Sequence, residues 1–394
     1  MFARINSARK AIALLFALFS ALVLAACQPV ALGGAASGGP AIDPNAAVPV
    51  ALLLPRGSGN TSDDLLSQSL ENAARLAIAD LAGVKIDLRV YGTGGQAGQA
   101  QSAAVQAVDE GAKIILGPVY AESANAVGVA VASKGVNVLS FSNNATIAGG
   151  NVFVLGPTFE NTANRLASFA SRQGKKRILV VHSQDLAGQL GSRAIQSAVA
   201  ASGATVAGVV GHEFSQQGVV SAVAQVKASA QAGNADAIFM TSNSAGALPL
   251  FSQLLPEAGL STATTQYIGL TRWDIPAQTL GMPGLQGGWF ALPDPGMSQR
   301  FEARYGAAYG TPPHPIGGLA YDGIAAIGAL VKAGKSDALT GASLTQSAGF
   351  QGVNGIFRLR PDGTNERGLA VAQVRDNRVV VIDPAPSAFG GAGF

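Results

Sequence analysis

The chain has 394 residues, of which 48% are hydrophobic and only 12% are charged. Three of its 26 Lys and Arg residues, Arg4, Arg9 and Lys10, precede Cys27, and no acid does, so 23 basic residues remain against 23 acidic ones. A balanced chain without a basic stripe excludes a nucleic-acid-binding protein. The length is sufficient for two domains.

The first 27 residues have the pattern of an export signal. Arg4, Arg9 and Lys10 precede a charge-free run, 11–24, which is too short to span a membrane and ends in "LAAC". This ending resembles a bacterial lipobox, which implies lipid attachment at Cys27 and makes Cys27 the mature N-terminus. The alternative is an ordinary signal peptide with an incidental cysteine. We expect an exported, lipid-anchored protein on the periplasmic face of the envelope. Gln28 favours the outer membrane if the host is Gram-negative.

The next segment, 28–47, is rich in Gly, Ala, Pro and Ser and carries one charge. This composition predicts a flexible tether between a membrane anchor and a folded body.

From residue 48 onward, apolar runs alternate with helical patterns. A first series has apolar runs at 48–55, 84–92, 113–119 and 137–143, with helical stretches between them. A second series has apolar runs at 176–183, 204–213, 235–243 and 265–273. The runs are continuously apolar, which indicates parallel strands covered on both faces. The sequence therefore predicts an α/β architecture with two similar lobes.

The C-terminal part, from about residue 284, does not continue this alternation of apolar and helical stretches. Two helical stretches, around 298–310 and 317–334, are followed by 352–382, which reads as antiparallel strands with Asp-Gly and Asp-Asn turns. Trp289 and Phe290 are expected in the core near a crossing between lobes. We expect this part to complete the two lobes already begun.

No strong catalytic, metal or cofactor motif is present. The chain lacks a phosphate-binding GxxxxGK[ST] loop and a G-x-S-x-G elbow, and its three histidines lack zinc-type spacing. The glycine-rich loop 91–99 is only a loose dinucleotide fingerprint. His212-Glu213 has the residue types of an acid–base pair, but the pattern favours a strand end that turns polar at the surface. We expect no enzyme activity, cofactor or metal.

Several sequence segments together resemble those of the type I periplasmic binding proteins, and in particular of the leucine/isoleucine/valine receptors of ABC transporters. They are "VPVALLLP", "IILGPVYAESANAV", "VNVLSFSNNAT", "KRILVVHSQDLAGQLGSRAIQSAVAASGATV" and "LAYDGIAAIGALVKAG". The resemblance covers 48–385 and implies two Rossmann-like lobes with parallel sheets joined by three crossovers. It places 48–158 plus 291–345 in lobe 1, 159–290 plus 346–385 in lobe 2, and 386–394 in a tail.

The resemblance also implies a ligand between the lobes. The ligand-binding residues carried over are Tyr120, Ala121, Glu122, Ser123, Ser142, Asn144, Arg272 and Trp273. Ser123 is expected to cap a helix and Tyr120 to lie at the rim. Arg272 and Trp273 either line the cleft or latch the lobes together. The sequence departs from the family at Ala121, where a contacting serine is usual, at Ala187, where an aromatic is usual, and at Arg272, near the usual acid.

These features favour a membrane-tethered solute-binding lipoprotein, an amino-acid-type ABC transporter receptor for a small polar ligand such as an amino acid or peptide.

A second resemblance leaves an alternative function open. "LTRWD" and "GGWFALPDP" are similar to the penicillin-binding protein activator lipoproteins, which regulate peptidoglycan synthesis through protein contact. The expected partner is therefore an ABC permease or a peptidoglycan synthase.

Overall fold

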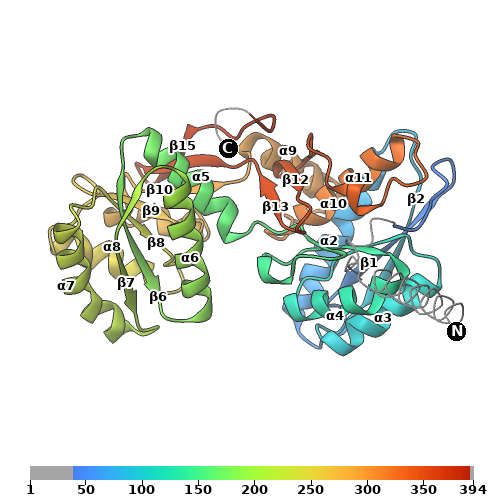
Figure 1. The fold of residues 1–394 in the computed structure, drawn as a ribbon, viewed down its shortest axis with the longest axis horizontal. Coiled ribbons are helices and arrows are strands. Elements are labelled where there is room, and N and C mark those ends of the chain that lie inside the picture. Colours follow the sequence, from blue (N-terminus) through green and yellow to red (C-terminus); the bar gives the residue numbers. More distant parts are fainter. Residues whose placement is uncertain (1–38, 391–394) are drawn as a thin grey trace, which may run out of the picture. The chain divides into compact units, whose positions relative to one another are not determined.

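The structure, a computed structural model, describes residues 39–390, which form two lobes (Figure 1). Cys27, the lipobox and the expected tether up to residue 38 lie outside the described residues.

Lobe 1 is built around a parallel five-stranded sheet with the order β2-β1-β3-β4-β5. Its strands are β1 (Val48–Leu54), β2 (Ile86–Gly92), β3 (Ile114–Leu116), β4 (Asn137–Ser140) and β5 (Val152–Val154). Its helices are α2 (Thr61–Asp80), α3 (Ala97–Asp109), α4 (Ala121–Val131), η1 (Ala132–Lys134), η2 (Ala145–Ile147), α9 (Pro295–Tyr309), α10 (Gly318–Lys332) and α11 (Gly341–Leu344). A small antiparallel sheet completes it, with β11 (Phe350–Gly352), β12 (Gly355–Leu359) and β13 (Asn365–Arg367).

Lobe 2 contains a seven-stranded sheet with the order β15-β14-β10-β9-β8-β6-β7. Its strands are β6 (Arg177–Ser183), β7 (Thr205–His212), β8 (Ala237–Met240), β9 (Gln266–Gly269), β10 (Trp289–Leu292), β14 (Ala370–Arg375) and β15 (Arg378–Asp383). Its helices are α5 (Phe159–Arg172), α6 (Leu186–Ala201), α7 (Gln216–Ala232), α8 (Leu248–Glu257), η3 (Ala277–Gly281) and η4 (Pro283–Leu285). Strands β6 to β10 are parallel, and the β14–β15 hairpin joins antiparallel.

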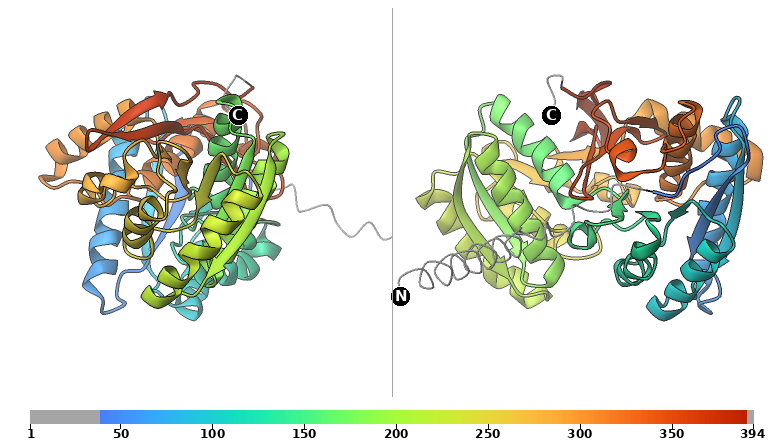
Figure 2. Two further views of the ribbon diagram at one scale, coloured as in Figure 1. Left: turned by 90° about the vertical axis from the view of Figure 1, so that its left-hand side faces the viewer. Right: turned by 45° about the vertical axis from the view of Figure 1, so that its right-hand side comes forward.

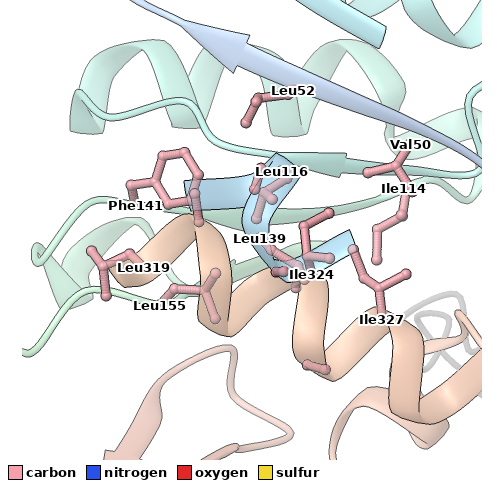
Figure 3. Close-up of a cluster of buried hydrophobic side chains, with 14 of the residues drawn as sticks. Val50, Leu52, Ile114, Leu116, Leu139, Phe141, Leu155, Leu319, Ile324 and Ile327 are labelled. Atoms are coloured by element: carbon pink, nitrogen blue, oxygen red, sulfur yellow. The ribbon is translucent and has the colours of Figure 1, made fainter. Parts of the chain in front are cut away.

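Both parallel sheets are covered on both faces, which explains the continuous apolar runs. In β1, Val50, Leu52 and Leu54 pack with α2 and α10, whereas Ala51 and Leu53 point to the opposite face, toward α3 and α4. Figure 3 shows the first face, with α10 lying against strands β1, β3 and β4. Helices α2 and α10 lie side by side although they are far apart in the sequence (Figure 2). The predicted α/β fold is confirmed.

Polar residues define the start of several helices. Thr158 and Asn161 form a reciprocal capping box at α5, and Asp185 and Ser215 accept hydrogen bonds from backbone amides at the starts of α6 and α7. Such side chains satisfy amides that the first turn of a helix leaves without a partner. The helices that follow β5, β6 and β7 therefore begin close to the ends of these strands.

The chain passes between the lobes three times, as the resemblance implies: between β5 and α5, between β10 and α9, and between β13 and β14. Two expected boundaries are wrong. The third crossing follows Arg367 rather than residue 345, because Phe350, Phe357 and Leu359 belong to the lobe 1 core. The second follows Leu292, because β10 is part of the lobe 2 sheet.

The expected tether and tail also need correction at their described ends. Ile42 is buried in the lobe 1 core, and its amide donates to the Ser336 carbonyl oxygen at 2.9 Å. The end of the 28–47 segment is thus part of the folded body, because an apolar side chain gains free energy by burial. In the expected tail, the Phe389 ring lies 4.5 Å from the Arg358 guanidinium carbon.

A buried ion pair lies where two of the crossings meet. Asp322 of α10 is fully buried, and its Oδ2 accepts from Arg367 Nη1 at 3.0 Å. Asp322 Oδ1 also accepts from the Val353 amide at 2.7 Å, and Arg367 Nε donates to the Leu155 carbonyl oxygen at 2.9 Å. Gly352 packs so closely that a Cβ there would lie 2.0 Å from Asp322 Oδ1. These contacts join α10, the ends of β11 and β13, and the end of β5.

We predict that Arg367→Met lowers the free energy of unfolding by about 3–5 kcal/mol, because it leaves the buried Asp322 carboxylate without its cation. The matched control is Arg360→Met, which removes an exposed partner of Glu366 and should cost less than about 1 kcal/mol. Urea denaturation followed by circular dichroism measures both values. Equal midpoints for the two variants would contradict the assignment.

Candidate functional site

The carboxyl ends of the parallel strands form one polar edge in each lobe. We call the loops after β1, β3 and β4 the lobe 1 edge, and the loops after β6, β7, β8 and β9 the lobe 2 edge. Ligands of open parallel sheets bind beyond these strand ends, where loops and helix N-termini supply polar groups.

The β3–α4 turn of the lobe 1 edge is shaped by Gly117. Its φ is +90°, and a Cβ there would lie 2.3 Å from the Leu53 carbonyl oxygen, so only glycine fits. Helix α4 starts soon afterward at Ala121, with Tyr120 at its N-cap. The turn therefore directs the first amides of α4 to the strand-end edge, as expected for an anion site.

The charge at this turn does not suit an anion. The Tyr120 hydroxyl donates to the Asp63 carboxylate, and this hydrogen bond raises the pKa of Tyr120 to about 12. Glu122 is exposed in the first turn of α4. Two acids therefore lie beside the helix start, where they oppose a ligand carboxylate.

The other predicted lobe 1 residues serve the shape of their loops. Ser123 is buried and does not cap α4, so that prediction is wrong; Tyr120 holds the N-cap position, and no side chain accepts a bond there. Ala121 is half-buried in the first turn. Ser142 Oγ accepts from the Asn144 amide at 3.1 Å, and Asn144 Oδ1 accepts from the Thr146 amide at 2.9 Å.

Arg272 and Trp273 follow β9 but have different environments. Arg272 is exposed and forms a two-bond pair with Asp274, and it lines a cavity of about 200 Å3 with apolar residues such as Leu292 and Ile316. Trp273 is fully buried in the lobe 2 core, 6.2 Å from the Phe290 ring centre. The expected ligand contact of Trp273 is thus wrong.

The position of Trp273 depends on two glycines. A Cβ on Gly269 or Gly288 would lie 2.3 Å or 2.4 Å from the Trp273 ring. The ring occupies the space that these glycines leave open. Trp289 and Phe290 are buried, which confirms the expectation for them.

We predict that Trp273→Ala lowers the free energy of unfolding by about 3–5 kcal/mol, because it leaves a large cavity in the lobe 2 core. Arg272→Ala, next to it but exposed, should cost less than about 1 kcal/mol. Denaturant titration of the two variants provides the comparison. A stable Trp273→Ala protein that has lost only ligand affinity would return this residue to the binding site.

The lobe 2 edge contains a small cavity of about 80 Å3, which we call the lobe 2 cavity. Polar side chains at the ends of four neighbouring strands share its wall with aromatic and small residues. The lining residues are Phe159, Ser183, Asp185, Ala187, Gly188, His212, Phe214, Thr241, Ser242, Asn243, Gly246, Ala247 and Thr271. Ala187 and His212 are among the residues to which the sequence drew attention.

His212 is a buried residue, so its interpretation as a surface strand end is wrong. Its Nδ1 lies 2.8 Å from the Glu213 carbonyl oxygen and therefore carries the proton. Burial lowers the pKa of His212 below its usual value, so the ring is predominantly neutral at pH 7. Its Nε2 has no hydrogen-bond partner among the described protein atoms.

Asp185 brings a fixed negative charge to the same wall. Its Oδ1 accepts from Ser183 Oγ at 2.6 Å and from the Gly188 amide at 2.7 Å. These bonds, that of Ser183 first, lower the pKa of Asp185, so the carboxylate is ionised at neutral pH. Asp185 thus both starts α6 and lines the cavity.

The signal that could have located this cavity is the strand-end rule itself. His212, Thr241 and Ser242 each follow a run of apolar residues, at the end of β7 or just beyond β8. Among residues 39–390, no group of three or more His, Cys, Asp or Glu could hold a metal ion.

Two lobes with parallel sheets, three crossings and a polar edge on each lobe define the class of two-lobed ligand-binding proteins. The chain belongs to the periplasmic binding protein family, which it matches over residues 47–378. The type I periplasmic binding protein resemblance is therefore confirmed. The family consists of solute-binding proteins, and membership implies export to the periplasm.

Solved structures show the same fold at low identity. A branched-chain amino acid ABC transporter periplasmic ligand-binding protein from Burkholderia xenovorans is 21% identical with a TM-score of 0.69, covering 87% of this chain and 97% of that one. An ABC transporter substrate-binding protein from Desulfitobacterium hafniense, in complex with Leu, is 19% identical with a TM-score of 0.63 over 86% and 100%.

A solute-binding protein of an ABC transporter from R. palustris, in complex with benzoate, is 18% identical with a TM-score of 0.57 over 88% and 99%. No curated protein sequence matches the chain. Within the described residues, none of the helices has the length and apolar character needed to cross a membrane.

Proposed function

We propose that this protein is a membrane-tethered extracytoplasmic receptor of an ABC transporter, and that it binds a small polar ligand between its two strand-end edges. The observation that supports this proposal most strongly is the lobe 2 cavity. Three buried side-chain atoms of its wall, on His212, Thr241 and Ser242, have no protein partner. Buried polar groups are nearly always hydrogen-bonded, so a ligand or water is the expected partner.

Hinge closure is the proposed mechanism. The three crossings near Leu155, Leu292 and Arg367 are the segments that connect the lobes and would bend on closure. A ligand that contacts both edges stabilises the closed form by its differential affinity for that form.

The ligand class is proposed as an amino acid, a short peptide or a molecule of similar size. The two liganded neighbours hold leucine and benzoate in their own structures, so this fold accommodates different ligands. In this chain, the acids at Asp63 and Glu122 disfavour a carboxylate at the α4 turn. The test panel must therefore extend beyond free amino acids.

We predict that at least one member of a panel of amino acids, short peptides, sugars and organic acids binds saturably in isothermal titration calorimetry. Binding should also reduce the radius of gyration measured by X-ray scattering, because the lobes close. Ala187→Arg should weaken binding by about tenfold or more, because the added cation covers the cavity mouth beside Asp185. Ala200→Arg, at an exposed position of the same helix, is the matched control.

Absence of binding across this panel, together with capture of a peptidoglycan synthase from envelope extracts, would contradict the receptor proposal. That outcome would favour the activator function that the second sequence resemblance left open.

The membrane anchor is proposed from the sequence alone. We predict that Cys27→Ser moves the protein from the membrane fraction to the soluble periplasmic fraction, because the acylated sulfur is lost. Cell fractionation and mass spectrometry of the mature N-terminus measure this change. Ser37→Ala, outside the lipobox, should leave the protein in the membrane fraction. A wild-type mature N-terminus that carries no acyl mass on Cys27 would contradict lipidation.

A further inference from the structure

We propose that the lobe 2 cavity recognises an uncharged hydrogen-bond donor of the ligand, a hydroxyl or an amide N–H, and that His212 Nε2 is the acceptor. The inference rests on the proposed function, since it concerns the same site, and it names the ligand chemistry. His212 becomes the residue that determines specificity in this lobe.

Three buried polar atoms without hydrogen-bond partners determine which groups a ligand must supply. His212 Nε2, Thr241 Oγ1 and Ser242 Oγ are buried without a hydrogen-bond partner in the described protein, and all three residues line the lobe 2 cavity. His212 and Ser242 are 3% and 6% exposed. The two hydroxyls can donate or accept, whereas a neutral imidazole nitrogen without a proton can only accept. The ligand must therefore present at least one donor.

The tautomer of His212 follows from its surroundings. Nδ1 lies 2.8 Å from a carbonyl oxygen, which can only accept, so the proton of the neutral ring is on Nδ1. The Phe251 ring packs edge-on against the imidazole, with ring centres 5.2 Å apart, and holds its orientation. The lone pair of Nε2 is thus fixed in position.

Moving a charged ammonium group into this small cavity costs desolvation free energy, and the one carboxylate among its lining residues, Asp185, is already engaged in hydrogen bonds. Burial, together with nearby His182, lowers the pKa of His212, although the hydrogen bond to the Glu213 carbonyl oxygen and the Asp185 carboxylate oppose this change. Asp185 Oδ1 is already used by Ser183 and by the start of α6. A ligand carboxylate is disfavoured as well, since it would face both Asp185 and the Nε2 lone pair. An uncharged donor avoids both costs.

The aromatic part of the wall suits the remainder of such a ligand. Phe214, which follows His212 by two residues, is 69% exposed, and Phe159 is half-buried at the start of α5. An aromatic face next to a polar cavity favours a ligand with an apolar face beside its donor groups, such as a sugar ring or a blocked peptide.

The same geometry makes binding sensitive to pH. The charged and titratable groups near the imidazole are His182 at the end of β6, Asp185 at the start of α6 and Glu213 in the following loop. Protonation of His212 converts Nε2 from acceptor to donor, so affinity should be constant at neutral pH. It should fall by about tenfold per pH unit once the pH is below the lowered pKa.

The experiment is a calorimetric titration of the full mature protein at pH 7.5 and pH 5. The uncharged probes are N-acetylglucosamine and N-acetylglycine amide, and the charged probes are leucine, benzoate and putrescine. We expect an uncharged probe to bind at pH 7.5. His212→Phe should weaken this binding by about 10- to 100-fold, because a buried hydrogen bond is lost.

Two variants separate recognition from structure. His212→Gln offers an amide oxygen that does not titrate, so it should restore most of the affinity and abolish the pH dependence. His314→Gln, which replaces a distant histidine whose pKa is also lowered by burial, should retain both the affinity and its pH dependence. Thermal unfolding of each variant verifies that it is folded.

The protonation state of His212 can be measured directly on the wild-type protein. In ¹⁵N NMR, His212 should show a protonated Nδ1 and an unprotonated Nε2 at pH 7.5, and Nε2 should shift when the bound probe is added. A protonated Nε2 would overturn the proposal. Binding of charged probes alone, or an unchanged affinity in His212→Phe, would overturn it and leave the receptor function standing. Failure of every probe in this and the wider panel would count against both.

Discussion

A buried ion pair between Asp322 and Arg367 holds together the segments that connect the two lobes. Asp322 lies on α10, which covers the lobe 1 sheet, and Arg367 ends β13 just before the chain enters lobe 2 for the last time. Arg367 also binds the carbonyl oxygen of Leu155, just after β5, where the chain first leaves lobe 1. Two crossings that both run from lobe 1 to lobe 2 are therefore fixed to one another. Since both strand-end edges project from sheets connected by these crossings, the position of any ligand site depends on this pair.

Much of the fold could be predicted because the sheets are covered on both faces. Strand β1 and the central residues 178–181 of β6 must then be apolar at every position, and their sequences show it. The third crossing could not be placed because β11, β12, β13 and β14 follow one another as similar short antiparallel strands. Only their packing partners differ: Phe357 is in the lobe 1 core, and Val371 is in the lobe 2 core. Strand propensity carries no information on which core a strand joins.

The site was harder to predict than the fold, because burial at a strand end depends on distant residues. Trp273 looks like a cleft residue in the sequence, yet Gly288, on another segment, leaves the space that its ring fills. His212 looks like a surface residue, yet the Phe251 ring of α8 covers one side of it. The predicted lobe 1 residues lie at the start of α4 and in the loop after β4, but the bond from Tyr120 to Asp63 could not be predicted from local sequence. The family resemblance located the edges, and only the packing identified the cavity.

The burial of Ile42 shortens the connection between the proposed lipid anchor and the body. Chain bound to lobe 1 begins at about residue 39, so only residues 28–38 separate it from Cys27. Even fully extended, such a segment reaches about 40 Å, whereas a connection up to residue 47 would reach about 70 Å. If Cys27 is acylated as proposed, lobe 1 would be the lobe held nearer the membrane. In hinge closure, lobe 2 would then move relative to lobe 1 and the membrane. A membrane-embedded partner could detect ligand binding by this change in the position of lobe 2.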